Sequence, residues 1–381
     1  MKKSIVFVPV VTSFITAFMG SALIPAIPSI GNQFHISTGA AGWTITVYMA
    51  ACALLTLPFG YLADKFSRNM ILVIGIGVFA VSSLAGGFSA GFFVLLGIRL
   101  LQGVGASMIF ATGLAILSDS AEEGKKGRLV GLHTAAMYTG LSLGPAAGGI
   151  INLHFGWKYI FLMTGMAASA VFLCALKLTS AGGRKKSIAS QNSLKEFCRS
   201  RVVICGILAA LISCCANYAV TYQLSLYMQQ VLGFSSQKTG IILIAFPAAQ
   251  AALSPWTGRI SDQIIPQNLA AAGMAVTAAV MGVLAWFTGA EGIDAVWVIA
   301  AILIAGGTGC AVFASPNAKG VMSAVPPDGY GRTGALLSVM RSLGNTCSMI
   351  LISVTDSMRL SFLILCGLCI LGIYVAFQKK M

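Results

Sequence analysis

A single arginine, Arg99, lies inside a long apolar segment that begins near Phe92. A guanidinium within a membrane helix costs roughly 2.5–3.5 kcal/mol on insertion scales, so it is expected to face a partner or a water-filled cavity rather than lipid. Helical spacing places four neighbours on or beside its face, where arginine, amide and aromatic groups can meet: Gln102, Gly103, Ala106 and Phe110. The alternative is an arginine at the membrane edge whose charge reaches the lipid headgroups. We therefore treat Arg99 as a candidate functional residue.

The composition indicates an integral membrane protein. Of the 381 residues, 57% are hydrophobic and only 9% are charged, which is too few polar residues to cover a soluble surface. Residues 4–63, 69–98 and 202–237 contain no Asp, Glu, Lys or Arg, and each stretch is long enough to cross a bilayer. The net charge of +14 is better explained by basic loops on one side of a membrane than by nucleic-acid binding.

The apolar pattern predicts twelve membrane helices in an all-α fold of two pseudo-symmetric six-helix bundles. The bundles cover residues 1–178 and 202–381, joined by a basic cytoplasmic linker, 179–201. Most Lys and Arg residues fall on the side of this linker, which predicts that both termini are cytoplasmic. We expect the helices at about 4–30, 39–62, 70–88, 91–117, 129–151, 157–178, 202–232, 236–260, 269–288, 295–321, 333–354 and 360–377.

Short motifs recur about 200 residues apart and indicate a duplicated chain. Gly60-Tyr-Leu-Ala-Asp64 is echoed by Gly258-Arg-Ile-Ser-Asp262, and Leu143-Gly144 is echoed by Leu343-Gly344. Many transporters are built from repeated halves with the binding site between them.

The loop Gly60-Tyr-Leu-Ala-Asp-Lys-Phe-Ser-Arg68 resembles a signature of the major facilitator superfamily. Asp64 can accept hydrogen bonds from a neighbouring helix N-terminus and Arg68 can pair with acids, which together would latch the cytoplasmic side. The alternative is a solvated turn whose charges only fix topology. The stretch from Arg99 to Gly105 resembles the superfamily's fourth-helix motif, and this resemblance implies a role of the arginine in proton coupling.

Three glycines of the fifth predicted helix, Gly140, Gly144 and Gly148, recur every four residues and form a strip without side chains. Such a strip permits close helix contact, and Pro145 removes a backbone donor and bends the helix, so this helix can act as a hinge or seal. The alternative is an ordinary contact between small residues. The stretch resembles the signature of exporters, which implies the drug:proton antiporter branch.

The predicted helices carry no Asp or Glu near their middle, so the simplest proton carrier and the simplest counter-charge for a cationic drug are absent. His133 is the only embedded group that would naturally titrate near neutral pH, and it has either a coupling or a structural role. Polar and aromatic residues of several helices are candidate substrate contacts, with hydrogen bonding between helices as the alternative: Gln102, Phe110, Tyr138, Asn217, Tyr218, Tyr222, Phe246, Gln250 and Asn317.

Together these features predict a secondary active transporter that exports drugs or other small molecules across a bacterial cytoplasmic membrane by alternating access with proton antiport. We expect neutral or anionic substrates, because the embedded charge is arginine without acid. The alternatives are an importer or uncoupled uniporter of a metabolite, and a non-transporting sensor. We expect no enzyme activity, cofactor, metal or nucleic acid, and a monomer whose partners are the bilayer, the substrate and protons.

Overall fold

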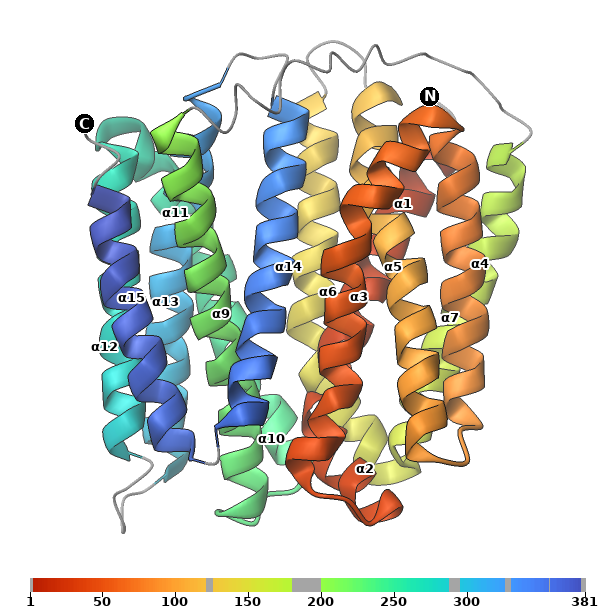
Figure 1. The fold of residues 1–381 in the computed structure, drawn as a ribbon, viewed down its shortest axis with the longest axis horizontal. Coiled ribbons are helices and arrows are strands. Elements are labelled where there is room, and N and C mark those ends of the chain that lie inside the picture. Colours follow the sequence, from red (N-terminus) through yellow and green to blue (C-terminus); the bar gives the residue numbers. More distant parts are fainter. Residues whose placement is uncertain are drawn as a thin grey trace. The chain divides into compact units, whose positions relative to one another are not determined.

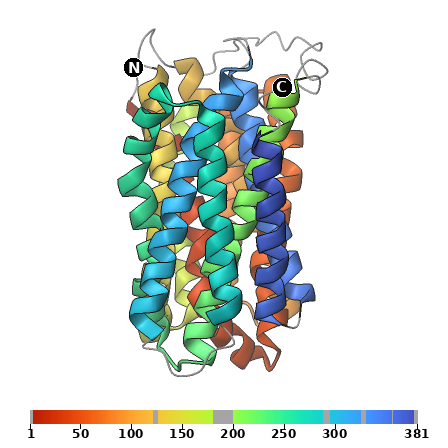
Figure 2. The same cartoon turned by 90° about the vertical axis from the view of Figure 1, so that its left-hand side faces the viewer.

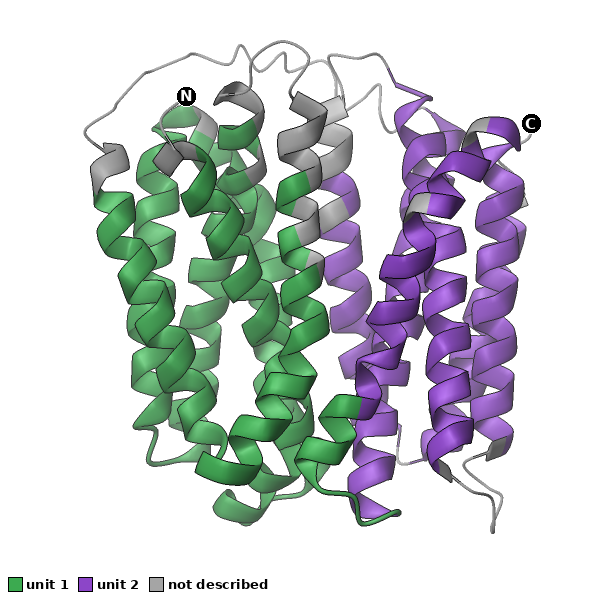
Figure 3. Cartoon of the chain, turned by 180° about the vertical axis from the view of Figure 1, so that it is seen from behind, with its two compact units in different colours: residues 1–189, 232–241 green, residues 190–231, 242–381 purple. Residues whose placement is uncertain are grey.

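A computed structural model describes residues 3–120, 126–179, 200–287, 295–325, 330–355 and 357–377. Within these ranges the secondary structure is helical and contains no strand, which confirms the expected all-α fold. The chain forms two compact units (Figure 3). Unit 1 comprises residues 1–189 and 232–241, and unit 2 comprises residues 190–231 and 242–381. Most of the predicted linker lies outside the described residues, so its boundaries stay a prediction.

Unit 1 is a bundle of long helices that lie side by side (Figure 1). Helix α1 packs on α6, α3 packs on α5, and α4 packs on both α5 and α7. The elements are α1 (Lys3–Ala22), η1 (Ile24–Ala26), α2 (Ile27–Phe34), α3 (Thr38–Lys65), α4 (Arg68–Gly87), α5 (Phe92–Ser120), α6 (Lys126–Phe155) and α7 (Trp157–Thr179).

Unit 2 is a second bundle, whose helices also run lengthwise beside one another (Figures 1 and 2). Helix α9 packs on α14, α11 packs on α13, and α12 packs on α13 and α15. Its elements are α9 (Arg201–Gln230), α10 (Ser236–Leu243), α11 (Ala245–Gln263), α12 (Pro266–Phe287), α13 (Ala295–Met322), α14 (Tyr330–Val354) and α15 (Met358–Phe377). Residues 236–241 of α10 belong to unit 1.

Two of the twelve predicted helices are broken by proline rather than continuous. The first, predicted over 4–30, divides into α1, η1 and α2, with Pro25 and Pro28 in the first turns of the second and third pieces. The eighth, predicted over 236–260, divides at Ile244 into α10 and α11, three residues before Pro247. Proline has no N–H to donate and its ring clashes with the preceding turn, so the chain starts a new helix there.

Close helix contacts occur at corresponding places in the two units. A Cβ atom added to Gly103 of α5 would lie 2.7 Å from the Tyr48 carbonyl oxygen of α3, and one added to Gly307 of α13 would overlap the Phe246 carbonyl oxygen of α11. Two more contacts correspond in the same way. Gly75 faces the Gly105 carbonyl oxygen in unit 1, as Gly273 faces that of Gly309 in unit 2. Gly144 faces the Phe18 carbonyl oxygen in unit 1, as Gly344 faces that of Leu211 in unit 2. The repeat seen in the sequence is therefore also a repeat of helix contacts.

Nine helical segments in the described part of the chain are long and apolar enough to cross a membrane. Their outward-facing side chains include many large apolar residues, such as Phe93, Leu173 and Trp297. A surface of this kind suits lipid, so the buried polar side chains inside each unit become the informative ones.

Candidate functional site

Arg99 of α5 lies in the interior of unit 1 with its side chain fully buried. Its Nε donates a hydrogen bond to the Thr44 carbonyl oxygen of α3 at 2.7 Å, and a terminal nitrogen donates to Oε1 of Gln102. The Gln102 amide in turn donates to the Ser83 hydroxyl of α4 at 2.7 Å. These bonds join three helices through one charge, and hydrogen bonds made by an ionised donor are stronger than those between neutral groups.

Two aromatic rings complete the surroundings of the guanidinium. Its central carbon lies 4.2 Å from the centre of the Tyr48 ring and 5.8 Å from the centre of the Phe161 ring of α7. The Tyr48 hydroxyl donates to the Thr16 carbonyl oxygen of α1 at 3.0 Å, and Phe161 packs edge-on against Trp157. Cation–π contacts and hydrogen bonds offset the cost of taking the charge out of water. Arg99 thereby connects, directly or through one neighbour, five helices of unit 1.

The helix face predicted around Arg99 points into unit 1, where α3 passes close by. Gly103 is required for this approach, because a Cβ atom there would lie 2.6 Å from the Ala51 Cβ atom. Ala106 is buried, and Phe110 is half-buried further along the helix. Tyr48, Phe161 and Ser83 were not identified from the sequence as members of this site. The only feature of the sequence that could have indicated one of them is that Tyr48 is a tyrosine within the apolar second predicted helix.

The glycine strip of α6 packs backbone to backbone against α1. Cβ atoms added to Gly140 and Gly148 would overlap carbonyl oxygens of α1, and one added to Gly144 would overlap the Ser21 hydroxyl. Ser21 also donates to the Leu141 carbonyl oxygen of α6 at 3.0 Å. These glycines therefore have no room for a side chain in this arrangement.

The far end of α6 also contacts residues 232–241, within unit 1. A Cβ atom on Gly149 would overlap the Ser236 carbonyl oxygen, and the Ser236 hydroxyl donates to the Gly149 carbonyl oxygen at 3.2 Å. The Asn152 amide donates to the hydroxyls of Ser29, 3.0 Å away, and Ser236, 3.2 Å away. We call Asn152, Ser29 and Ser236 the Asn152 cluster. No sequence motif pointed to it, since its members come from three separate segments.

His133 lies near the other end of α6, and its side chain is buried against α1. Its Nε2 atom is 2.6 Å from the Ser13 hydroxyl, which also donates to the Pro9 carbonyl oxygen at 2.8 Å. Gly113 of α5 leaves space for the ring, because a Cβ atom there would lie 3.2 Å from Nε2. The histidine is therefore held by a hydroxyl of α1, a partner that the sequence did not suggest.

Three further predicted residues are placed only in part. The side chains of Asp64 and Tyr138 lie outside the described residues. Arg68 is half-buried at the first position of α4, after Ser67, whose hydroxyl accepts from the Met70 N–H at 3.5 Å as an N-terminal cap. Serine is a preferred residue at that position.

The candidate substrate contacts of unit 2 are mostly buried. The Asn217 amide donates to the Ser213 hydroxyl at 3.2 Å, within α9, and the Asn317 amide of α13 donates to the Gly206 carbonyl oxygen of α9 at 3.0 Å. Phe246 of α11 packs on Gly306 and Gly307 of α13. Tyr218 and Tyr222 are buried on α9, and Gln250 is half-buried on α11.

Among the side chains that the structure describes, no group of three or more His, Cys, Asp or Glu residues is arranged to hold a metal ion. In the described part of unit 1, the buried groups instead include the Arg99 guanidinium, amides, hydroxyls, the His133 imidazole and aromatic rings. Such groups can bind and orient a ligand, and the imidazole can exchange a proton. Because they come from six helices, α1 and α3 to α7, they are sensitive to any movement of one helix past another.

Comparison with known proteins identifies the family. A model of the Major Facilitator Superfamily matches residues 10–349. The riboflavin transporter RibZ of Clostridioides difficile (strain 630) is 25% identical, over 87% of this chain and 83% of RibZ. Multidrug resistance protein Stp of Mycobacterium tuberculosis (strain CDC 1551 / Oshkosh) is 24% identical, over 84% of this chain and 70% of Stp.

Solved structures share the fold. A bacterial homologue of the human lysosomal transporter Spinster superposes with a TM-score of 0.78 at 15% identity, over 98% of this chain and 96% of that chain. The likeness agrees with the helical bundles described above. Because the family model also spans most of the sequence, the chain belongs to the major facilitator superfamily of membrane transporters.

Proposed function

We propose that this transporter exports drugs or other small molecules across a bacterial cytoplasmic membrane by alternating access, driven by protons that move inward. Two of its relatives are named for resistance to multiple drugs and to methylenomycin A, which supports export. The glycine strip of α6 supports it further, since the same residues resemble the signature of exporters and are packed directly on α1.

The observation that carries the proposal is the enclosure of Arg99. A guanidinium held by Thr44, Gln102 and two aromatic rings from neighbouring helices is costly to bury and is expected where function requires it. In the proposed cycle, Arg99 couples proton movement to the packing of α3, α4 and α7. Asp64 and Arg68 latch the cytoplasmic side, and the glycine strip with Pro145 acts as the hinge.

The proposed substrates are neutral or anionic. Two arginines lie well inside predicted membrane helices, Arg99 in α5 and Arg341 in α14. Both charges are positive, and a positive interior repels a permanent cation. The proposed contacts are the residues predicted above, from Gln102 and Phe110 in unit 1 to Asn317 in unit 2.

A second candidate function is import or uncoupled passage of a metabolite. It is favoured by the similarity to RibZ, whose name gives riboflavin as its substrate without a direction. The lack of Asp and Glu near the middle of the predicted helices also favours it, since a carboxylate is the simplest proton carrier.

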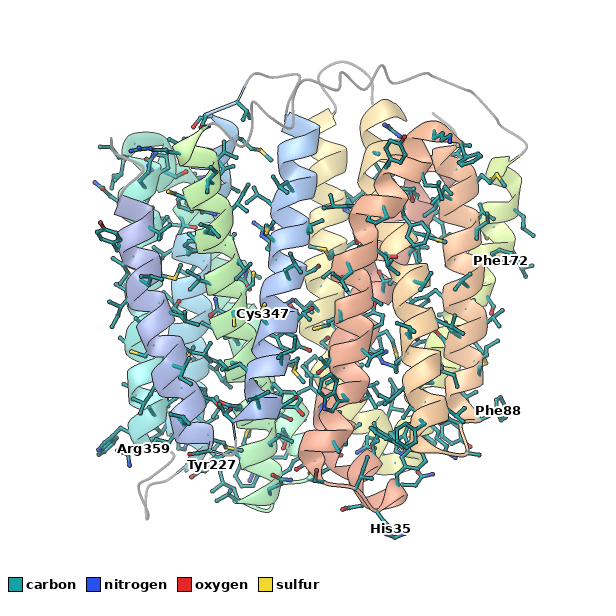
Figure 4. The ribbon with its side chains drawn as sticks, viewed as in Figure 1. His35, Phe88, Phe172, Tyr227, Cys347 and Arg359 are labelled. Carbon is teal, nitrogen blue, oxygen red and sulfur yellow. The ribbon has the colours of Figure 1, made fainter. Side chains whose placement is uncertain are left out.

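Transport into inside-out vesicles separates these functions. Purified protein in vesicles with a pH-sensitive dye is offered riboflavin, fluorescein and ethidium, with and without a proton gradient. The proposal expects that the proton gradient drives accumulation of a neutral or anionic compound and that protons are released at the same time. This accumulation should be lost in Arg99→Ala. It should be kept in the control Arg359→Ala, which changes an exposed arginine (Figure 4). Transport without any pH change would favour the second function, and equal transport of ethidium would contradict the substrate preference.

A further inference from the structure

A second arginine, Arg341, lies near the middle of α14 in unit 2. At 1.5 Å per residue it is about 17 Å from the first residue of that helix and about 20 Å from the last, too far for its charge to sit at a membrane surface. It lies within Val339–Val354, an apolar helix segment. A charge in such a place is expected to face the interior of the bundle and to have a function.

The neighbours of Arg341 show which way it faces. Arg341 and Gly344 are three residues apart and therefore lie on the same face of α14. One turn further on, Gly344 packs so closely that a Cβ atom would overlap the Leu211 carbonyl oxygen of α9. Cys347, still further along α14, is labelled in Figure 4. Arg341 is therefore directed into unit 2 and away from lipid.

Two buried polar atoms lie one turn beyond this helix contact. The Asn217 side-chain oxygen of α9 and the Ser348 hydroxyl of α14 have no hydrogen-bond partner among the described residues. Both side chains are more than nine-tenths buried. Helices α9 and α14 run in the same direction (Figure 1), so one turn onward is the same level on each. Leaving such atoms unsatisfied costs about 1–3 kcal/mol each, and a ligand that hydrogen-bonds to them recovers that cost.

The two embedded arginines differ in burial. Arg99 is fully buried and contacts a backbone carbonyl, an amide and two rings. Arg341 is half-buried. A guanidinium presents parallel N–H donors that match the two oxygens of a carboxylate or of a similar planar acceptor pair.

We propose that Arg341 binds the substrate, and that it selects molecules carrying a carboxylate or an equivalent planar pair of oxygen acceptors, with Asn217 and Ser348 contacting the polar groups next to it. This assignment rests on the proposed transport function. It adds a role in substrate recognition for Arg341 in unit 2 to the role in proton coupling proposed for Arg99 in unit 1. It also predicts that a cation of the same shape gains nothing from Arg341.

Binding of two xanthene dyes to the full chain in nanodiscs tests the proposal. Fluorescein carries a carboxylate and is anionic, whereas rhodamine 123 has a similar ring system and is cationic. In fluorescence anisotropy titrations, we expect Arg341→Gln to raise the Kd of fluorescein about tenfold or more and Arg341→Lys to raise it less, because lysine keeps the charge without the paired donors. The Kd of rhodamine 123 should stay within about twofold.

The controls distinguish recognition from misfolding. Arg359→Gln changes an exposed arginine and should leave both Kd values unaltered. Arg341→Lys serves if Arg341→Gln does not fold. An equal loss of both dyes in Arg341→Gln, or no loss of fluorescein, overturns the proposal.

Transport of the same dyes into vesicles tells the two proposals apart. If fluorescein binding depends on Arg341 but neither dye is transported, the binding site is supported and the transport function is refuted. If the proton gradient drives transport that Arg341→Gln does not alter, the transport function is supported and the Arg341 binding site is refuted.

Discussion

The guanidinium of Arg99 lies 4.2 Å from the centre of the Tyr48 ring, and the two residues come from different helices, α5 and α3. The matching contacts of Gly103 and Gly307 place Leu303 in unit 2 where Arg99 stands in unit 1, and Phe246 where Tyr48 stands. Leu303 is fully buried. The charged contact therefore exists in one half of a duplicated structure, which makes it a feature added to the common fold rather than a requirement of it.

Replacing Tyr48 tests how much the ring contributes. A desolvated cation–π contact is worth about 2 kcal/mol, so Tyr48→Leu is expected to destabilise unit 1 by about that amount and to lower transport. Tyr48→Phe keeps the ring and loses the hydroxyl that donates to Thr16, for an expected cost of about 1 kcal/mol. Thermal unfolding in detergent, followed by tryptophan fluorescence, measures both. Equal effects of the two variants would show that the hydroxyl, and not the ring, supports Arg99.

Replacing the glycines of α6 tests the contact with α1. Gly148→Ala places a Cβ atom on the Ala22 backbone oxygen, which cannot turn aside, so we expect a loss of about 1–3 kcal/mol and little transport. Gly144→Ala meets the Ser21 hydroxyl, and the second change Ser21→Ala should recover part of its loss. Gly97→Ala in α5 is the matched control, because nothing lies within 4 Å of a Cβ atom there. Normal transport by Gly148→Ala would contradict the close packing.

Much of the fold could be predicted from the sequence because membrane helices obey strong constraints. Long apolar stretches and the few charged residues between them located the twelve predicted helices within a few residues, and the echo of Leu143-Gly144 by Leu343-Gly344 marks a contact that the structure repeats. The breaks near Pro25 and at Ile244 were missed, since proline is tolerated in membrane helices and its presence alone does not say whether a helix bends or stops.

The candidate site was only partly predictable. Arg99 and Gln102 are three residues apart on one helix, so their contact follows from helical spacing. Tyr48, Phe161 and Ser83 come from three other helices, and sequence spacing carries no information about which faces of separate helices meet. The same reason hid the Ser13 partner of His133 and the whole Asn152 cluster.

The Asn152 cluster is expected to hold residues 232–241 against α6. Asn152→Ala removes the amide that donates to Ser29 and Ser236, at an expected cost of about 1–2 kcal/mol. Hydrogen exchange measured by mass spectrometry should then rise in peptides covering residues 232–241. Asn268→Ala, which changes an asparagine of α12 in unit 2, is the control and should leave these peptides unaffected. Unchanged exchange in Asn152→Ala would show that the backbone contact between Gly149 and Ser236 suffices.

The pair formed by His133 and Ser13 gives a test of proton coupling that does not depend on Arg99. A serine hydroxyl has one hydrogen. While Ser13 donates it to the Pro9 carbonyl oxygen, its hydroxyl oxygen can only accept a hydrogen bond from His133, and this requires a proton on Nε2. If Nε2 loses that proton, the Ser13 hydroxyl can turn from Pro9 and donate to the imidazole, which removes a hydrogen bond inside α1 beside a proline. If His133 couples protons, His133→Gln should flatten the pH profile of transport while folding is retained. Ser13→Ala should keep the titration but weaken its effect on the transport rate. Transport rates of the three proteins, measured in vesicles over a series of pH values, test this, and an unaltered profile in His133→Gln would assign the histidine a structural role.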